Sequence, residues 1–203
     1  MVRYLFVLFG LMLISFGVFA FNRDSAFLSP SPKVAGTTEK KLIYNNWFPK
    51  KPAGNTSEQV LSLTSRSAIL TDYDTGDVVF SKNSGQKLPA ASTVKIMTAL
   101  LVLENGQPEG KVKISEKAAN VGENAMGVST GEELTQKDLL YGLMLVSGND
   151  AAVGLAEAVA GSEEAFVVMM NERARKLGLT DTRFINASGL DVDGEAQYTT
   201  AYD

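Results

Sequence analysis

Residues 92–105 read STVKIMTALLVLEN, a stretch typical of the central helix of a folded domain. Every residue from Ile96 to Val102 except Thr98 is apolar, which predicts a helix from Ser92 to about Glu104 that is buried on most sides. The lysine at position 95 is unexpected there, because charged side chains are rarely buried without a partner. Positions i and i+3 share one face of a helix, so the Ser92 hydroxyl and the Lys95 amine are expected to approach each other.

A lysine can act as a base only if its surroundings remove its charge. An exposed lysine has a pKa of about 10.4, so roughly one molecule in 2500 carries a neutral amine at pH 7. Burial can lower this pKa by about 3 to 5 units, because apolar surroundings penalise the charged form. A buried Lys95 could then accept the Ser92 proton. Free N–H groups at the helix start would favour the oxyanion formed by attack on a carbonyl.

The spacing alone is a weak signal, since a chain of this length contains about one S-x-x-K by chance. A second copy at residues 84–87 contains a glycine and is expected in a solvated loop. The tripeptide Ser147-Gly148-Asn149 adds a second element, because it lies where one apolar helix ends and another begins. Its hydroxyl and amide could relay a proton and hold Lys95. The alternative interpretation is a helix stop followed by an Asn149 N-cap, and residues 81–83 repeat the S-x-N spacing.

The composition excludes several kinds of catalytic site. The 203 residues include no cysteine and no histidine. Disulfides, thiol nucleophiles, imidazole zinc ligands and a Ser-His-Asp triad are therefore excluded. A net charge of -4 without any basic block gives no support for nucleic-acid binding. The length and the 45% hydrophobic content suit one domain, or a fragment of a larger one.

The N-terminal segment predicts export. Residues 1–21 carry one positive charge at Arg3 and then an apolar run. They are interpreted as a signal peptide cleaved near Ala20 or as a retained membrane anchor. Residues 22–59 mix proline, serine, lysine and glycine without a period and predict a linker, so order is expected to begin near Val60. The remainder of the chain is then expected to work outside the cytoplasm.

Local signals predict the remaining elements. Alternating residues between 67 and 83 indicate two strands joined by a hairpin turn at residues 74–77. Thr135 is the predicted N-cap of a helix over residues 136–146, and a further helix is predicted over residues 150–159. Ser162 is expected to cap a last helix that ends at Gly178. Residues 111–134 suggest only short pieces, and the tail from residue 179 is expected to be loop-like.

Four stretches together closely resemble the serine-type D-alanyl-D-alanine carboxypeptidases, the low-molecular-weight penicillin-binding proteins. The resemblance runs from about residue 60 to the end and implies an α+β, β-lactamase/transpeptidase-like fold, in which helices flank an antiparallel sheet and a helical subdomain is inserted. It implies Ser92 as acylated nucleophile, Lys95 as its base, and Ser147 and Asn149 as the second motif. The stretches are LPAASTVKIMTALLVLE, LMLVSGNDAAVGLAEAVAG, MNERARKLGLTDTRFINASGLD and YTTAYD.

The resemblance also implies the binding partners. The substrate is the D-Ala-D-Ala end of a peptidoglycan stem peptide, β-lactams would acylate the same serine, and no metal or organic cofactor is implied. One departure is clear: no lysine here is followed by Thr-Gly or Ser-Gly, so the family's K-T-G motif is absent. The Ser-Thr-Gly at residues 129–131 has the wrong first residue and position. We therefore expect the N-terminal part of such an enzyme, truncated before the later sheet strands.

Two rival readings remain. A class A β-lactamase shares the first two motifs but needs a glutamate in an E-x-x-x-N setting after the second. Here the only such spacing, at residues 116–120, comes before Ser147. The other rival is a non-catalytic exported module that binds β-lactams or the cell wall, which the missing K-T-G motif favours.

Overall fold

The computed structural model describes residues 63–192 and 194–203. The predicted export segment (1–21), the linker (22–59) and Val60 lie outside these residues. The described elements are, in chain order, β1 (Ala68–Thr71), β2 (Val78–Lys82), β3 (Leu88–Pro89), the 3-10 turn η1 (Ala91–Thr93), α2 (Val94–Asn105), β4 (Lys111–Lys113), α3 (Glu116–Ala119), β5 (Glu133–Thr135), α4 (Gln136–Leu145), α5 (Asn149–Ala160), α6 (Glu163–Leu177) and β6 (Tyr198–Thr199).

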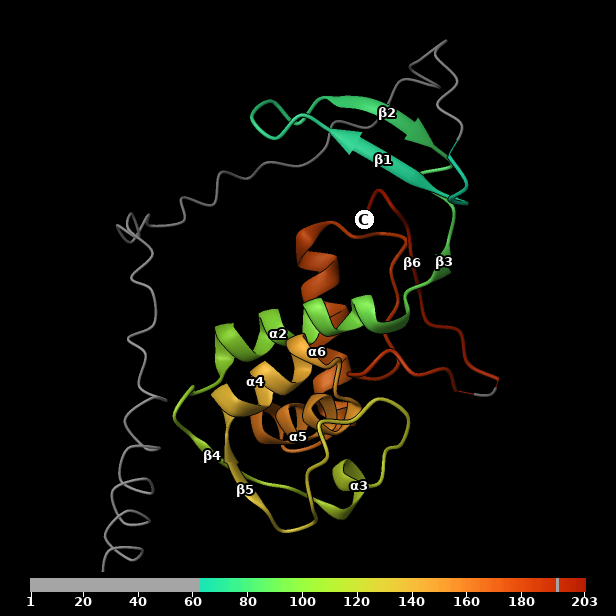
Figure 1. Ribbon diagram of the computed structural model, residues 1–203. Helices are drawn as coiled ribbons and strands as arrows, with labels where there is room; N and C mark the ends of the chain where they lie inside the picture. The colour runs from blue at the N-terminus through green and yellow to red at the C-terminus, as the bar shows by residue number, and fades with distance from the viewer. Residues whose placement is uncertain (1–62, 193) are drawn as a thin grey trace, which may run out of the picture. The chain divides into compact units, whose positions relative to one another are not determined.

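A cluster of helices around α5 forms the core. Figure 1 shows α2, α4 and α6 gathered beside α5, and α3 also contacts it. Residues 149–156 of α5 are all buried, and many of them are small, so neighbouring helices can approach closely. The largest fully buried side chains of the cluster are Phe166, Ile114, Leu139, Leu143, Leu155 and Met170.

The predicted helix ends are confirmed where a capping side chain marks them. Thr135 and Asp138 form a capping box at the start of α4. The Ser162 hydroxyl accepts the Ala165 N–H at the start of α6. At the other end of α6, Gly178 adopts a φ of 80°, in the left-handed region that glycine enters without steric cost.

The predicted hairpin is also confirmed. Strands β1 and β2 pair antiparallel, with Ala68 opposite Lys82. In the connecting turn, the Asp72 carboxylate accepts the N–H groups of Asp74 and Thr75. This carboxylate satisfies turn backbone that the sheet leaves unpaired, and these hydrogen bonds, chiefly those with Thr75, lower the Asp72 pKa.

The expectation of a loop-like tail was wrong at one place. Within the tail, β6 pairs antiparallel with β3, Leu88 opposite Thr199. Two-residue strands show no hydrophobic alternation, so the sequence carried no signal for this pairing. Strands β4 and β5 form a further antiparallel pair, so the described strands make three separate two-stranded sheets.

Helix α2 differs from the prediction in two respects. It begins at Val94, and Ser92 lies in the preceding 3-10 turn. One face is also exposed, since Ile96 and Leu103 are 64% and 68% accessible. The apolar run did not distinguish the two faces of the helix, because apolar residues occur on both. No helix among the described residues is long and apolar enough to cross a membrane.

Candidate active site

The structure brings together Ser92, in the 3-10 turn η1, and Lys95, in the first turn of α2. The Lys95 Nζ lies 3.3 Å from the Ser92 Oγ. The residue before the serine, Ala91, has a φ of 45°, which is uncommon for a residue with a side chain. Such strained backbone persists only where surrounding contacts impose it, and it is concentrated at functional sites. Ser92 is exposed and therefore accessible to a ligand.

Lys95 is buried and has two short hydrogen bonds to neutral oxygens. Its side chain is 3% exposed, and the Nζ donates to the Asn149 Oδ1 at 2.8 Å and to the Ser188 carbonyl at 2.7 Å. Burial lowers the pKa of Lys95 below its ordinary value, while the charge of Glu123 opposes this by a smaller amount. These contacts therefore orient the amine, and neither acceptor is an anion that would stabilise its positive charge.

The Ser-Gly-Asn motif lies at the junction of α4 and α5, and its side chains contact Ser92 and Lys95. Ser147 has a φ of 58°, and its Oγ donates to the Ser92 Oγ at 3.1 Å. The Asn149 Nδ2 donates to the Gly122 carbonyl at 3.1 Å, which turns the amide oxygen toward Lys95. The alternative interpretation of Asn149 as an N-cap is wrong, because Gly148 is the N-cap and Asn149 is the first helical residue.

The sequence predicted a loop-like tail, but it did not reveal that the loop at residues 186–190 holds one acceptor of the lysine. Asn186 Oδ1 accepts the Gly189 N–H at 2.7 Å, and its Nδ2 donates to the Leu190 carbonyl at 2.7 Å. A Cβ added at Gly189 would lie 2.1 Å from the Ala91 carbonyl oxygen, so only glycine allows this approach to the serine turn. The Asn-x-x-Gly spacing was a signal for such a turn.

Asp150 is a second residue that the sequence did not single out. It is 1% exposed, and its carboxylate accepts the N–H groups of Met126, Gly127 and Val128 at 3.0, 2.9 and 3.3 Å. These bonds fix the segment that follows Glu123 and so shape one wall of the site. The acidic residue directly after the Ser-Gly-Asn motif was the available signal.

A cavity of about 210 Å³ opens beside the serine. Its lining includes Ser92, Asn149 and Ser188, together with Glu123 and Asp191. A larger cavity of about 400 Å³, at the C-terminal end of α6, contains none of the predicted site residues. Among the described residues, no group of three or more acidic side chains is arranged to hold a metal ion.

The rejected motif copies lie elsewhere. In the copy at residues 84–87, Lys87 pairs with Asp181 at 3.1 Å. The prediction of a solvated loop was wrong for Ser84, which is 8% exposed because its hydroxyl bonds Ser81 and its carbonyl accepts the Tyr202 N–H. Neither Glu116 nor Ser129 lines the cavity beside Ser92.

Together these contacts define a serine acyl-transfer type of site. An exposed hydroxyl stands beside a buried amine, and a second hydroxyl and an amide orient both. Such a group can activate a serine without histidine, because the amine takes the role of general base.

Comparison with known proteins agrees with this class. Residues 54–203 match the D-alanyl-D-alanine carboxypeptidase family. D-alanyl-D-alanine carboxypeptidase DacF of Bacillus subtilis is 44% identical over 162 aligned positions, and the alignment covers 77% of this chain and 40% of the relative. The crystal structure of the carboxypeptidase DacD from Francisella tularensis superposes with a TM-score of 0.67 at 33% identity, covering 85% of this chain and 40% of that one.

A third match is a structure with a bound drug. Penicillin-binding protein D2 from Listeria monocytogenes, solved in its cefotaxime-bound form, has a TM-score of 0.62 at 30% identity and covers 70% of this chain and 59% of that one. The chain therefore belongs to the D-alanyl-D-alanine carboxypeptidase family, and the expected α+β penicillin-binding-protein fold is confirmed over the shared part. It spans about 40% of the length of the curated relatives it matches.

Proposed function

We propose that this chain carries the acylation centre of a penicillin-sensitive serine D-Ala-D-Ala carboxypeptidase. The substrate would be the D-Ala-D-Ala end of a peptidoglycan stem peptide, and the reaction would remove its terminal D-alanine during cell-wall synthesis and remodelling. One observation supports this most strongly. The buried Lys95 amine lies 3.3 Å from the Ser92 hydroxyl, and its two shorter hydrogen bonds both go to neutral oxygens.

The N–H bonds and the lone pair of the Lys95 amine are arranged as the role of base requires. A neutral lysine amine has two N–H bonds and one lone pair. If the two N–H groups donate to Asn149 and Ser188, the lone pair faces the Ser92 hydroxyl. The Ser147 hydroxyl already donates to the Ser92 oxygen, so the Ser92 proton is free to turn toward Lys95.

Acylation then follows with balanced protons. The Ser92 oxygen attacks the carbonyl carbon of the penultimate D-alanine while its proton passes to Lys95. The carbon–nitrogen bond breaks, and a proton from Lys95, relayed through Ser147, leaves with the amine of the terminal D-alanine. Water hydrolyses the resulting ester and restores the Ser92 hydroxyl. A β-lactam would follow the first half of this path, its ring amide replacing the peptide bond.

A second candidate function concerns the 203 residues taken alone, which contain no K-T-G motif. In this family, the strand with that motif is expected to supply one oxyanion donor and the groups that bind the substrate carboxylate. Loss of one oxyanion donor costs about 10²- to 10³-fold in rate. For these residues alone, the alternative is a catalytically inactive module that binds β-lactams or the cell wall. A β-lactamase is disfavoured, because Glu116 precedes Ser147 in the chain and does not line the cavity.

The proposed location is outside the cytoplasm, in the cell envelope or secreted. The single charge at Arg3 and the apolar run of residues 1–21 support this proposal. An uncleaved segment would also provide membrane attachment.

Labelling with a fluorescent penicillin tests the proposal. We expect Ser92→Ala to abolish labelling and Lys95→Ala to reduce it strongly, whereas Ser84→Ala, which alters the other S-x-x-K, should label normally. D-alanine release from a pentapeptide ending in D-Ala-D-Ala then separates the two candidates: labelling without release supports the binding module. Persistent labelling of Ser92→Ala would exclude this serine as nucleophile.

A further inference from the structure

The Ser188 carbonyl can orient Lys95 only if its loop keeps its place. This acceptor belongs to the irregular backbone at residues 186–190, and it lies 2.7 Å from the Lys95 Nζ. Contacts within the loop, such as the Asn186 side chain to the Gly189 N–H, shape it but do not fix it to the helices. The loop therefore depends on contacts from outside, and one is the Thr98 hydroxyl, which donates to the Ala187 carbonyl at 2.7 Å.

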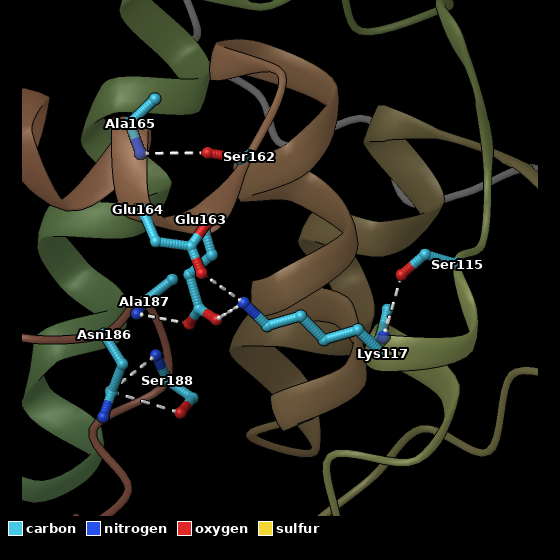
Figure 2. Close-up of polar contacts among 10 residues, drawn as sticks. Ser115, Lys117, Ser162, Glu163, Glu164, Ala165, Asn186, Ala187 and Ser188 are labelled. Carbon is cyan, nitrogen blue, oxygen red and sulfur yellow. Dashed lines mark hydrogen bonds and ion pairs between the residues drawn. The ribbon is translucent and has the colours of Figure 1, made fainter.

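Another external contact is made by a carboxylate. Glu163 Oε1 accepts the Ala187 N–H at 3.1 Å, and its Oε2 pairs with the Lys117 Nζ at 3.0 Å. Figure 2 shows the Glu163 carboxylate between the extended Lys117 side chain and the loop backbone at Ala187 and Ser188. The Glu163 side chain is only 12% exposed. Its contacts thus join α3, α6 and the loop one residue before the Lys95 acceptor.

The neighbouring acid provides a contrast. Glu164 pairs with the same lysine at 2.9 Å, but its side chain is 75% exposed, and the Ala187 N–H goes to Glu163. Capping of α6 does not explain the Glu163 contact either, because the Ser162 hydroxyl already accepts the Ala165 N–H there. The loop contact is thus a separate property of Glu163.

We propose that Glu163, oriented by Lys117, is a positioning residue that holds the loop so that the Ser188 carbonyl keeps the Lys95 amine directed at Ser92. This inference rests on the proposed function, because it assumes that Lys95 is the base. Without the carboxylate, the Ala187 N–H loses its acceptor and the loop can move away from α6. The amine then loses one of its two short bonds, and its lone pair is no longer fixed toward the serine oxygen.

Two alanine variants of the 203-residue chain test this. With a fluorescent penicillin, rapid-mixing measurements separate the dissociation constant of the initial complex from the first-order acylation rate constant. Glu163→Ala is expected to lower the rate constant about 10- to 100-fold with the dissociation constant unchanged, since misplacement of a reacting group has effects of that order. Glu164→Ala removes the other partner of Lys117 and should leave both constants unchanged. Glu163→Gln should recover most of the rate, because its amide oxygen can still accept the Ala187 N–H.

A second measurement does not depend on the reaction. Amide hydrogen exchange, followed by NMR, should show faster exchange of the Ala187 N–H in Glu163→Ala and no change in Glu164→Ala. Equal acylation rate constants in the two alanine variants, or unchanged Ala187 exchange in Glu163→Ala, would overturn the proposal. If the unaltered chain is not acylated, the proposed function fails, and the exchange comparison alone supports or overturns the positioning of the loop by Glu163.

Discussion

Replacing Gly189 with alanine should displace the serine turn, which is the 3-10 turn η1 that contains Ser92. A Cβ at this position would lie 2.1 Å from the Ala91 carbonyl oxygen, 2.5 Å from the carbonyl carbon and 3.1 Å from the Ser92 nitrogen. All three are backbone atoms, so no side chain can rotate away. Gly178 is the matched control, because its φ of 80° is close to the 89° of Gly189 while a Cβ there would meet nothing within 4 Å.

The two variants share one cost and differ in another. Alanine in the left-handed region costs about 1 to 2 kcal/mol, which applies to both positions. At Gly189 the Ala91 oxygen must in addition retreat by roughly 0.9 Å, because Cβ contacts below 3.0 Å essentially never occur. Overpacking of this kind costs a further 1 to 3 kcal/mol or so. A displacement near 1 Å at the residue before the nucleophile can lower the acylation rate about 100-fold.

Urea unfolding followed by circular dichroism measures the free energies, and fluorescent-penicillin labelling of the folded proteins measures the rates. We expect Gly178→Ala to lose about 1 to 2 kcal/mol with normal labelling, and Gly189→Ala to lose about 2 to 5 kcal/mol with labelling about 100-fold slower. If Gly189→Ala folds and labels as fast as Gly178→Ala, the contact with Ala91 does not hold the serine turn, and the reasoning is wrong.

Two further predictions concern the charged groups of the site. Burial lowers the pKa of Lys95, so labelling should rise with pH through a value below the ordinary 10.5, because only the neutral amine accepts the serine proton. Asn149→Asp places a carboxylate against this amine and should move the rise to higher pH; identical pH profiles of the two labelling rates would contradict the base role. Asp150→Ala removes a buried acceptor of three successive N–H groups at residues 126–128, one of them, on Gly127, exposed enough to rehydrate. At about 1 to 3 kcal/mol for each of the two buried donors left unpaired, the loss should total about 2 to 6 kcal/mol in urea unfolding, and a loss below about 1 kcal/mol would refute this role.

Local signals predicted the parts of the fold that local physics determines. The Ser162 cap and the left-handed Gly178 mark the two ends of α6, and both act within one turn of the helix. The approach of Ser92 and Lys95 also follows from helical spacing, although a 3-10 turn carries the serine. Each of these features needs only neighbours in the sequence.

The parts that depend on distant contacts were not predictable in the same way. The Ser188 acceptor is a backbone carbonyl 93 residues from Lys95, and every residue has such a group. The pairing of β3 with β6 likewise depends on segments too short to show a period. The exposure of Ile96 depends on which elements pack against α2, which the apolar run does not encode. Ser147 and Asn149 were predicted because their motif falls at a helix junction and because the resembling family has such a motif.

Two lysines of this chain show why the charge of the acceptors decides the chemistry. Lys117 contacts the carboxylates of Glu163 and Glu164, and these contacts, chiefly the hydrogen bond to Glu164, raise its pKa. Lys95 also has two hydrogen bonds below 3 Å, but its acceptors are an amide oxygen and a backbone carbonyl, and burial lowers its pKa. Neutral acceptors fix the direction of an amine without fixing its charge, whereas anionic acceptors fix both. Under the proposed mechanism Lys95 must be neutral before it accepts the serine proton, and an asparagine at position 149 permits this where an aspartate would oppose it.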